Sequence, residues 1–229
     1  MSQDAVLQLL DAGLLQEMKH TTVEYKKDSV IVPPDIALKY VYRIIKGLVI
    51  VYTSHRDDKN THLIYGKDEL FPLASISGKT RKGLYYAALS DCIVEQYSLS
   101  TFQKRLQTDP AFSYATLCEV ITQFMLFKAR VDNLEYQYAS ERLAYKILML
   151  SHQFGKYSKN GVQLQLPALT NQDIANTINL TRESVNRELA KFVKSGLVTV
   201  ENNRITIVDE ERLRQQITRY PQDLYLDNI

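Results

Sequence analysis

Short runs of β-branched and aromatic residues alternate with turn-forming residues through the first part of the chain. Such runs are typical of strands. Turns such as Pro33-Pro34-Asp35 and Ser77-Gly78 separate them at spacings that favour a small antiparallel barrel or sandwich. The expected strands are Thr22–Tyr25, Ser29–Val32, Tyr40–Ile45, Leu48–Thr53, His62–Tyr65, Tyr85–Ala88 and Ile93–Tyr97. The pattern predicts an antiparallel β-barrel of jelly-roll or cupin-like type over residues 1–108, which begins with an amphipathic helix.

A second pattern begins at Asp109-Pro110, after which neither Gly nor Pro interrupts the chain until Gly155. Apolar residues recur there at alternating three- and four-residue spacings, the sign of a helix that pairs with another helix. They are Leu117, Val120, Phe124, Phe127, Val131, Leu134 and Tyr138. We expect a dimerisation helix over residues 109–138 that meets a second copy of itself. The alternative is a long helix buried within one subunit.

The third pattern predicts two short helices followed by a hairpin. Thr170 and Asp173 form a capping box that opens the first helix, and Asn179 tolerates the left-handed backbone of a tight turn. Thr181 caps the second helix and Gly196 ends it. The expected hairpin strands are Leu197–Val200 and Arg204–Val208. This order of elements describes a winged helix-turn-helix.

The second of these helices separates apolar from polar residues. Its apolar stripe, expected to pack on the first helix, consists of Val185, Leu189, Phe192 and Val193. Its N-terminal end carries the candidate base-reading residues Arg182, Glu183, Asn186 and Arg187. Arginine donates twice to guanine, asparagine pairs with adenine, and glutamate accepts from cytosine. The candidate phosphate-binding residues are Thr181, Ser184 and Lys191. The alternative is an ordinary solvated helix face.

Composition changes this picture little. The 229 residues carry a net charge of only +2, but residues 139–207 hold nine Lys and Arg against five Asp and Glu, which permits phosphate binding in the domain expected over 139–229. No apolar run approaches the roughly 20 residues that span a bilayer, so we expect a cytoplasmic protein without membrane contact. Cys92 and Cys118 lie in no metal-binding spacing, and no catalytic motif is complete. We therefore expect no cofactor, no metal and no enzymatic activity.

The order of β domain, long helix and winged helix-turn-helix, with the segment DIANTINLTRESVNRELAKFVKSGLV inside it, resembles the CRP/FNR family of bacterial transcription regulators. The resemblance covers nearly the whole chain. It implies an α+β protein that binds a palindromic site on double-stranded DNA as a homodimer, with RNA polymerase as a further partner. It also implies base contacts for Arg182, Glu183 and Arg187, and a discriminating position at Asn186. Asn179 replaces the glycine of many members.

The expected sensor domain departs from the members of this family that bind cyclic nucleotides. Those members carry a Gly-Glu pair and an Arg-Ser pair, and here Phe71-Pro72 and Lys82-Gly83 stand in their places. A lysine lacks the planar fork of arginine, and no acid is left for the ribose. We therefore expect that any effector differs from cyclic AMP. Arg81 and Lys82 are candidates for binding another anion, and the alternative is an ordinary solvated loop. The alternative function is a ligand-binding regulatory module whose helical tail contacts protein and not DNA.

Overall fold

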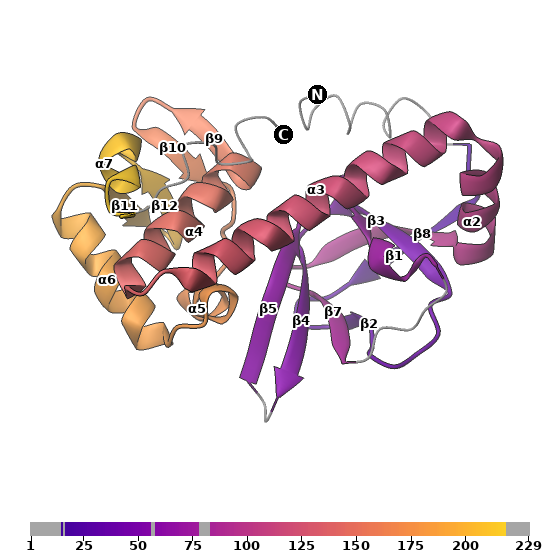
Figure 1. Ribbon diagram of the computed structural model, residues 1–229, viewed down its shortest axis with the longest axis horizontal. Helices are drawn as coiled ribbons and strands as arrows, with labels where there is room; N and C mark the ends of the chain where they lie inside the picture. The colour runs from indigo at the N-terminus through magenta and orange to yellow at the C-terminus, as the bar shows by residue number, and fades with distance from the viewer. Residues whose placement is uncertain (1–14, 16, 56–57, 78–82, 219–229) are drawn as a thin grey trace. The chain divides into compact units, whose positions relative to one another are not determined.

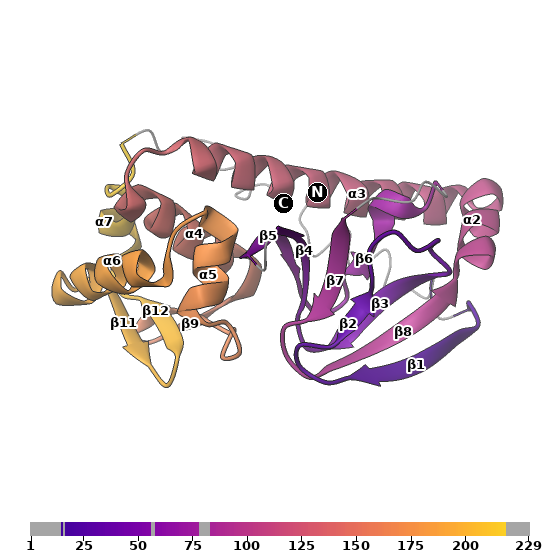
Figure 2. The same ribbon diagram turned by 90° about the horizontal axis from the view of Figure 1, so that it is seen from below.

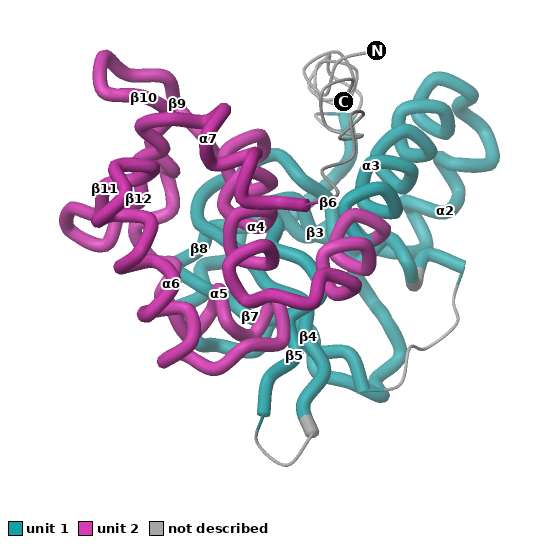
Figure 3. The backbone as a smooth tube through the Cα atoms, turned by 60° about the vertical axis from the view of Figure 1, so that its left-hand side comes forward, with its two compact units in different colours: residues 1–127, 228–229 teal, residues 128–227 magenta. Residues whose placement is uncertain are grey.

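A computed structural model describes residues 15, 17–55, 58–77 and 83–218. The chain divides into two compact units, and the division falls between Phe127 and Lys128, inside one long helix (Figure 3). The expected boundaries, by comparison, stand at 108/109 and 138/139. The N-terminal helix expected within residues 1–14 and the candidates Arg81 and Lys82 lie outside the described residues.

The first unit contains two four-stranded antiparallel sheets (Figure 2). One sheet has the order β1 (His20–Tyr25), β8 (Cys92–Ser98), β3 (Tyr40–Lys46) and β6 (Leu70–Phe71). The other has the order β2 (Val30–Val32), β7 (Leu84–Ala88), β4 (Val49–His55) and β5 (Asp58–Tyr65). The expected antiparallel β domain is confirmed, although its described strands form two sheets instead of a closed barrel. Side chains of both sheets share one core, so burial and not edge pairing joins them.

A second apolar cluster lies where the chain leaves the sheets. It joins the short helix η2 (Leu73–Ser75) and helix α2 (Leu99–Thr108) to the start of helix α3 (Pro110–Glu135). Phe102 of α2 and Phe112 of α3 are fully buried there, with ring centroids 4.9 Å apart. The sequence pattern assigns no element to the segment that forms α2, although Leu99, Phe102 and Leu106 recur at helical spacing and pack into this cluster.

The second unit is built around helix α4 (Ala139–Phe154), which packs against α5 (Asn171–Ile178), α6 (Arg182–Lys194), α7 (Glu210–Arg214) and β10 (Gly161–Leu164) (Figure 1). A four-stranded sheet has the order β11 (Val198–Glu201), β12 (Arg204–Ile207), β10 and β9 (Gly155–Ser158). The two helices and the hairpin of the third pattern are confirmed. The β9–β10 hairpin extends the wing into a larger sheet that the pattern did not predict.

A break between α3 and α4 interrupts the helical pattern although no Gly or Pro lies there. Tyr138 adopts an extended backbone conformation, and Glu141 accepts a hydrogen bond from its N–H at 3.2 Å. This capping interaction starts a new helix directly after the old one. No helix in the described part of the chain is long and apolar enough to cross a bilayer.

Candidate nucleic-acid interface

Helices α5 and α6 are bounded by side-chain caps, as the sequence predicts. Thr170 Oγ1 accepts from the N–H of Asp173 at 3.1 Å, and Asp173 Oδ2 accepts from the N–H of Thr170 at 2.8 Å. Asn179 ends α5 in the left-handed region with φ 53°. Thr181 then caps α6 by accepting from the N–H of Ser184 at 3.1 Å. The caps satisfy one first-turn N–H group in each helix, those of Asp173 and Ser184, and fix where both helices begin.

The apolar side of α6 is buried against α5. Val185 is fully buried, Leu189 and Phe192 are almost so, and Ile174 and Ile178 of α5 lie in the same core. Val193 differs from the prediction, because it is 43 % exposed. The buried stripe of α6 therefore ends at Phe192.

The side chains expected to read bases are exposed at the start of α6. Arg182, Glu183, Asn186 and Arg187 are all classed as exposed, and they lie within the first two turns of the helix. Asn171 Nδ2 donates to Asn186 Oδ1 at 2.6 Å, so α5 orients the carboxamide of Asn186. An exposed, polar N-terminal end on a helix whose apolar side is buried is the surface that a recognition helix presents to the major groove.

Glu188 organises the basic residues of this surface, and the sequence pattern had not identified it. Its carboxylate accepts from Lys191 Nζ at 2.9 Å and from Arg187 Nε at 3.2 Å. Burial opposes its ionisation, but the hydrogen bonds from Lys191 and Arg187 outweigh burial and lower the pKa of Glu188. The buried carboxylate of Glu188 thus orients the side chains of Arg187 and Lys191. The sequence around Glu188 does not distinguish it from a solvent-exposed glutamate, and its contact with the two basic residues becomes evident only from its burial in the fold.

The candidate phosphate ligands surround the N-terminus of α6. Thr181 is exposed, Ser184 is half-buried, and their hydroxyl oxygens are 3.0 Å apart. The side chain of Lys191 is 63 % exposed despite its contact with Glu188. Two hydroxyls and a helix N-terminus form a compact donor group of the kind that binds an oxyanion.

The wing is tied to the helices by Asn203, a residue of the turn expected between the two hairpin strands. Asn202 and Asn203 both have positive φ, which closes the β11–β12 hairpin. Asn203 Nδ2 donates to the carbonyl oxygen of Leu169 at 2.8 Å and to that of Pro167 at 3.2 Å. The wing is therefore held beside the chain that enters α5.

The apolar seam of α3 is exposed to solvent. Leu117, Val120, Phe124, Phe127 and Val131 are 54 %, 36 %, 62 %, 42 % and 41 % exposed. Leu134 is half-buried, and Tyr138, 66 % exposed, lies beyond the end of α3. The buried side of the same helix holds many polar residues, including Thr116, Glu119, Thr122, Gln123, Arg130 and Asn133. This inversion leaves a large apolar surface without a partner in the subunit.

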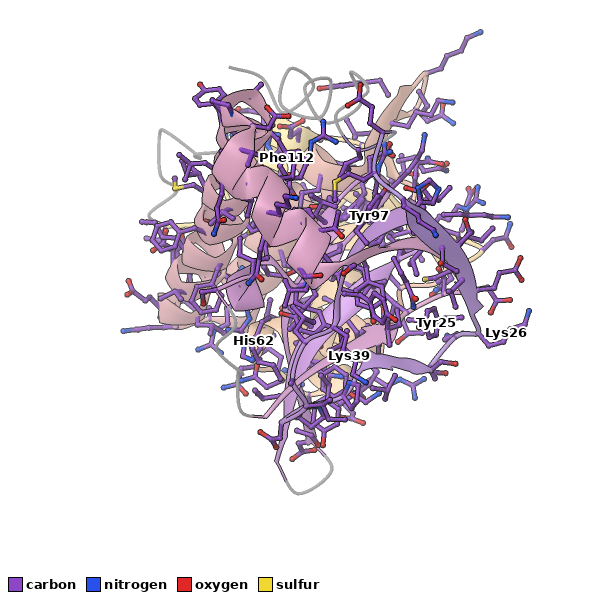
Figure 4. All side chains as sticks on the ribbon, turned by 90° about the vertical axis from the view of Figure 1, so that its right-hand side faces the viewer. Tyr25, Lys26, Lys39, His62, Tyr97 and Phe112 are labelled. Carbon is purple, nitrogen blue, oxygen red and sulfur yellow. The ribbon has the colours of Figure 1, made fainter. Side chains whose placement is uncertain are left out.

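A cavity of about 570 Å³ lies between the β-sheets and α3 within the first unit. Its lining is mainly aliphatic and aromatic, with His62 of β5 and Gln123 of α3 among the few polar residues. His62, labelled in Figure 4, has its ring centroid 6.3 Å from that of Phe127. Phe71, at the position where cyclic-nucleotide binders carry glycine, is fully buried and stacks on Tyr42 with centroids 5.1 Å apart.

Comparison with known proteins finds relatives with the same arrangement. Residues 141–216 match the family description of a Crp-like helix-turn-helix domain. The chain is 24 % identical to a global nitrogen regulator of Synechococcus elongatus, over 85 % of this chain and 89 % of that protein. It is 21 % identical to the cAMP-activated global transcriptional regulator CRP of Escherichia coli, over 80 % and 88 % of the two chains. The structure of FixK2 from Bradyrhizobium japonicum matches with a TM-score of 0.78 and 20 % identity, covering 88 % of this chain and 99 % of that one.

Proposed function

Because this chain belongs to the CRP/FNR family of DNA-binding transcription regulators, which are not enzymes, we propose that it reads a palindromic DNA site as a homodimer. The observation that carries the proposal is the exposed group Arg182, Glu183 and Arg187 at the capped start of α6. Inserted into the major groove, the two arginines donate to guanine and Glu183 accepts from cytosine. Asn186, oriented by Asn171, discriminates between related sites.

Phosphate contacts set the register of this helix on the duplex. Thr181 and Ser184 offer hydroxyl donors beside the remaining free N–H groups of the first turn of α6. Lys191 offers an exposed ammonium group further along the same helix. Such contacts orient the protein without reading sequence. Lys191 exchanges its contact with Glu188 for a DNA phosphate when the complex forms.

Dimerisation through α3 supplies the second reading helix. The exposed seam from Leu117 to Val131 buries its apolar side chains when it meets the same seam of another copy. Leu134 and Tyr138 continue that interface to the end of α3. A symmetric dimer reads two half-sites about one helical turn of DNA apart, which explains the need for a palindrome.

The cavity beside α3 supports control by an effector other than cyclic AMP. A cyclic phosphate and a ribose need cationic and acidic partners, and none of the described residues that line the cavity is a cation or an acid. Its lining suits a ligand that is largely apolar and makes few hydrogen bonds. Phe124 and Phe127 line it and also belong to the α3 seam, so a bound effector alters the proposed dimer interface directly.

RNA polymerase is the further partner that we propose, and the β9–β10 hairpin is the surface that supports it. Every residue of β9 is exposed, and Tyr157 is exposed to 85 %. Exposed aromatic residues such as tyrosine are enriched at protein-binding surfaces. Tyr157→Ala should leave binding to the isolated duplex unchanged and weaken recruitment of polymerase to it.

Selection from a random duplex library tests the proposed function. The wild-type protein should enrich a palindrome, whereas a variant carrying Arg182→Ala and Arg187→Ala should enrich none. Arg212→Ala is the control, because Arg212 is also an exposed arginine of the second unit but lies on α7 and contacts α6 only at its C-cap, Ser195, at the opposite end from the reading residues. Failure of the wild-type protein to enrich any sequence, with the fold intact by circular dichroism, would favour a regulatory module that binds protein.

A further inference from the structure

Two side chains of α3 bind the main-chain N–H and carbonyl groups of Leu70 in β6. Gln123 Nε2 donates to the carbonyl oxygen of Leu70 at 2.8 Å, and the carboxylate of Glu119 accepts from the N–H of Leu70. Gln123 also donates to Glu119 Oε1 at 2.9 Å. Glu119 is 2 % exposed and Gln123 is 9 % exposed. The helix therefore satisfies both peptide groups of a buried strand residue, as a neighbouring strand would.

Glu69, the residue before Leu70, brings a second buried acid to this contact. It is 6 % exposed, and its carboxylate accepts from the main-chain N–H of Gly66. Its own carbonyl oxygen accepts from Ile44 of β3 at 3.1 Å. Glu69, directly before β6, and Glu119 of α3 are thus two buried carboxyl groups, close enough for the charge of Glu119 to act on Glu69.

The groups that face this pair supply no positive charge. Helix α3 contributes Glu119 itself, and β5 contributes the buried hydroxyl group of Tyr65. The charges of Glu69 and Glu119 both raise the pKa of that hydroxyl group. From β3, Arg43 is directed to Asp68, with Nη2 2.7 Å from Oδ1. Among the described residues, neither Glu69 nor Glu119 forms an ion pair. Two negative charges in such a site repel each other strongly, because little solvent screens them.

The pair accordingly retains one proton near neutral pH. Burial, and then the charge of Glu119, raises the pKa of Glu69 to about 8. Burial also raises the pKa of Glu119, but the hydrogen bonds from Gln123 and Leu70 favour its charged form and oppose that rise. The proton of the pair therefore lies on Glu69, while Glu119 keeps the charge that binds Leu70.

We propose that Glu69 and Glu119 form a proton-controlled latch that fixes α3 to β6 while the pair holds one proton and releases it when both groups ionise. Loss of the proton places two charges side by side, and separating α3 from β6 admits water to both. α3 also carries the exposed seam that we assign to the dimer. The latch thus makes the position of the dimer helix depend on pH, and its link to DNA rests on the proposed function.

The sign follows from the proton that the closed state holds. In the closed state α3 is fixed to β6, and in the open state the two are separated. The closed state binds the proton of Glu69 more tightly, so raising the pH to about 8 favours the open state and weakens DNA binding. If the pKa of Glu69 differs by about one unit between the two states, DNA affinity falls by about tenfold. Lowering the pH again restores it.

The test compares the wild-type protein with Glu69→Gln, which keeps the acceptor for Gly66 but cannot ionise. Amide hydrogen exchange at Leu70 is measured in both proteins between about pH 6.5 and 9, and their ratio at each pH removes the intrinsic pH dependence of exchange. We expect that ratio to rise as the pH increases towards about 8 and to level off above it, because the closed state holds its extra proton only below that pKa. DNA affinity for the library-derived duplex should fall over the same range in the wild-type protein only. Glu135→Gln, at an exposed position of α3, is the control and should behave as wild type.

A second variant keeps the test informative if Glu69→Gln does not fold. Glu119→Gln removes the neighbouring charge, so the pKa of Glu69, followed by NMR of labelled glutamate side chains, should fall towards its ordinary value. A wild-type exchange ratio that stays constant over the whole range would overturn the latch, as would a Glu69 that titrates alike in the presence and absence of Glu119. If exchange responds as expected while no duplex binds at any pH, the latch stands and the proposed function fails.

Discussion

Arg142 Nη1 lies 3.4 Å from the carbonyl oxygen of Asn179, so the first turn of α4 is tied to the turn of the helix-turn-helix. The same guanidinium group donates through Nε to the carbonyl oxygen of Tyr136 at 2.8 Å, in the break between α3 and α4. Arg142 therefore connects the segment that follows α3 to the turn that precedes α6. Sequence patterns alone do not reveal this connection, because all the acceptors are main-chain carbonyl groups.

Replacing Arg142 tests that connection. Arg142→Lys keeps the charge but loses the planar fork, so it should weaken specific DNA binding by about 1–2 kcal/mol while leaving the dimer intact. Binding to duplexes is measured by fluorescence anisotropy. Arg214→Lys, on α7, serves as the control, because Arg214 also makes a guanidinium contact but is remote from the turn. Equal affinity of Arg142→Lys and wild type would show that the contact plays no part in positioning α6.

Arg187 and Lys191 share the carboxylate of Glu188 but should have different effects on DNA binding. Arg187→Ala should cost about 1–3 kcal/mol on the preferred palindrome and relax the preference at one base position of each half-site. Lys191→Ala should weaken all duplexes alike and reduce the salt dependence of binding. Affinity measured on the palindrome and on single-base variants separates the two effects. An unchanged base preference in Arg187→Ala would contradict its role in reading sequence.

The exposed seam of α3 predicts the effect of a charge at its centre. Phe124→Asp should yield monomers, because a carboxylate on each helix at the seam would be buried opposite its own copy. Sedimentation measures the mass. Ala111→Asp, at an exposed position at the start of α3 outside the seam, should remain dimeric. The monomer should also lose specific DNA binding, since one reading helix makes too few contacts. A Phe124→Asp variant that sediments as a dimer would exclude this seam as the interface.

Cyclic AMP and cyclic GMP should not bind with micromolar affinity. Each phosphate or ribose group that loses water without gaining a partner costs about 1–3 kcal/mol, and a micromolar complex is worth about 8 kcal/mol in total. Calorimetry of the ligand-free protein with each nucleotide checks this. Micromolar binding together with tenfold tighter DNA binding would show that other groups replace the missing Gly-Glu and Arg-Ser pairs.

Lys146 predicts a pH-dependent stability in the second unit. Burial, and then the charge of Arg130, lowers the pKa of Lys146 to about 8 in the folded protein. The unfolded chain therefore binds more protons between pH 8 and the ordinary lysine value of 10.5, and the free energy of unfolding rises with pH across that window. Lys146→Met should stabilise the protein by about 1–3 kcal/mol at neutral pH and lose this advantage near pH 10. Urea unfolding at both pH values measures the difference. A constant difference would refute the shift.

Much of the architecture could be predicted because strand and helix periodicities depend on local chemistry. The expected strands at Tyr40–Ile45 and Tyr85–Ala88 differ from β3 and β7 by one residue at one end. The caps at Thr170 and Thr181 were predictable for the same reason, since side chain and N–H are close in sequence. The break at Tyr138 was not, because tyrosine is not a usual capping residue and Glu141 completes its cap.

Residues whose role depends on distant partners could not be predicted. Glu69, Glu119 and Glu188 look like solvated acids when only their neighbours in sequence are considered, and burial in the fold alone sets them apart. Phe71 was recognised as a departure from the cyclic-nucleotide pattern, but its place in an aromatic stack required the pairing of β6 with β3. Long-range pairing is the information that a single sequence does not display.

If the exposed apolar seam of α3 is the dimer interface that we propose, the amount of DNA-binding protein depends on the concentration of the chain. When monomers predominate, the amount of dimer varies with the square of the chain concentration, so halving the number of chains leaves about a quarter of the dimers. A regulator of this design responds to the rate of its own synthesis and degradation even at constant effector. Its copy number, set by expression of its gene, then acts as a second input to the promoter.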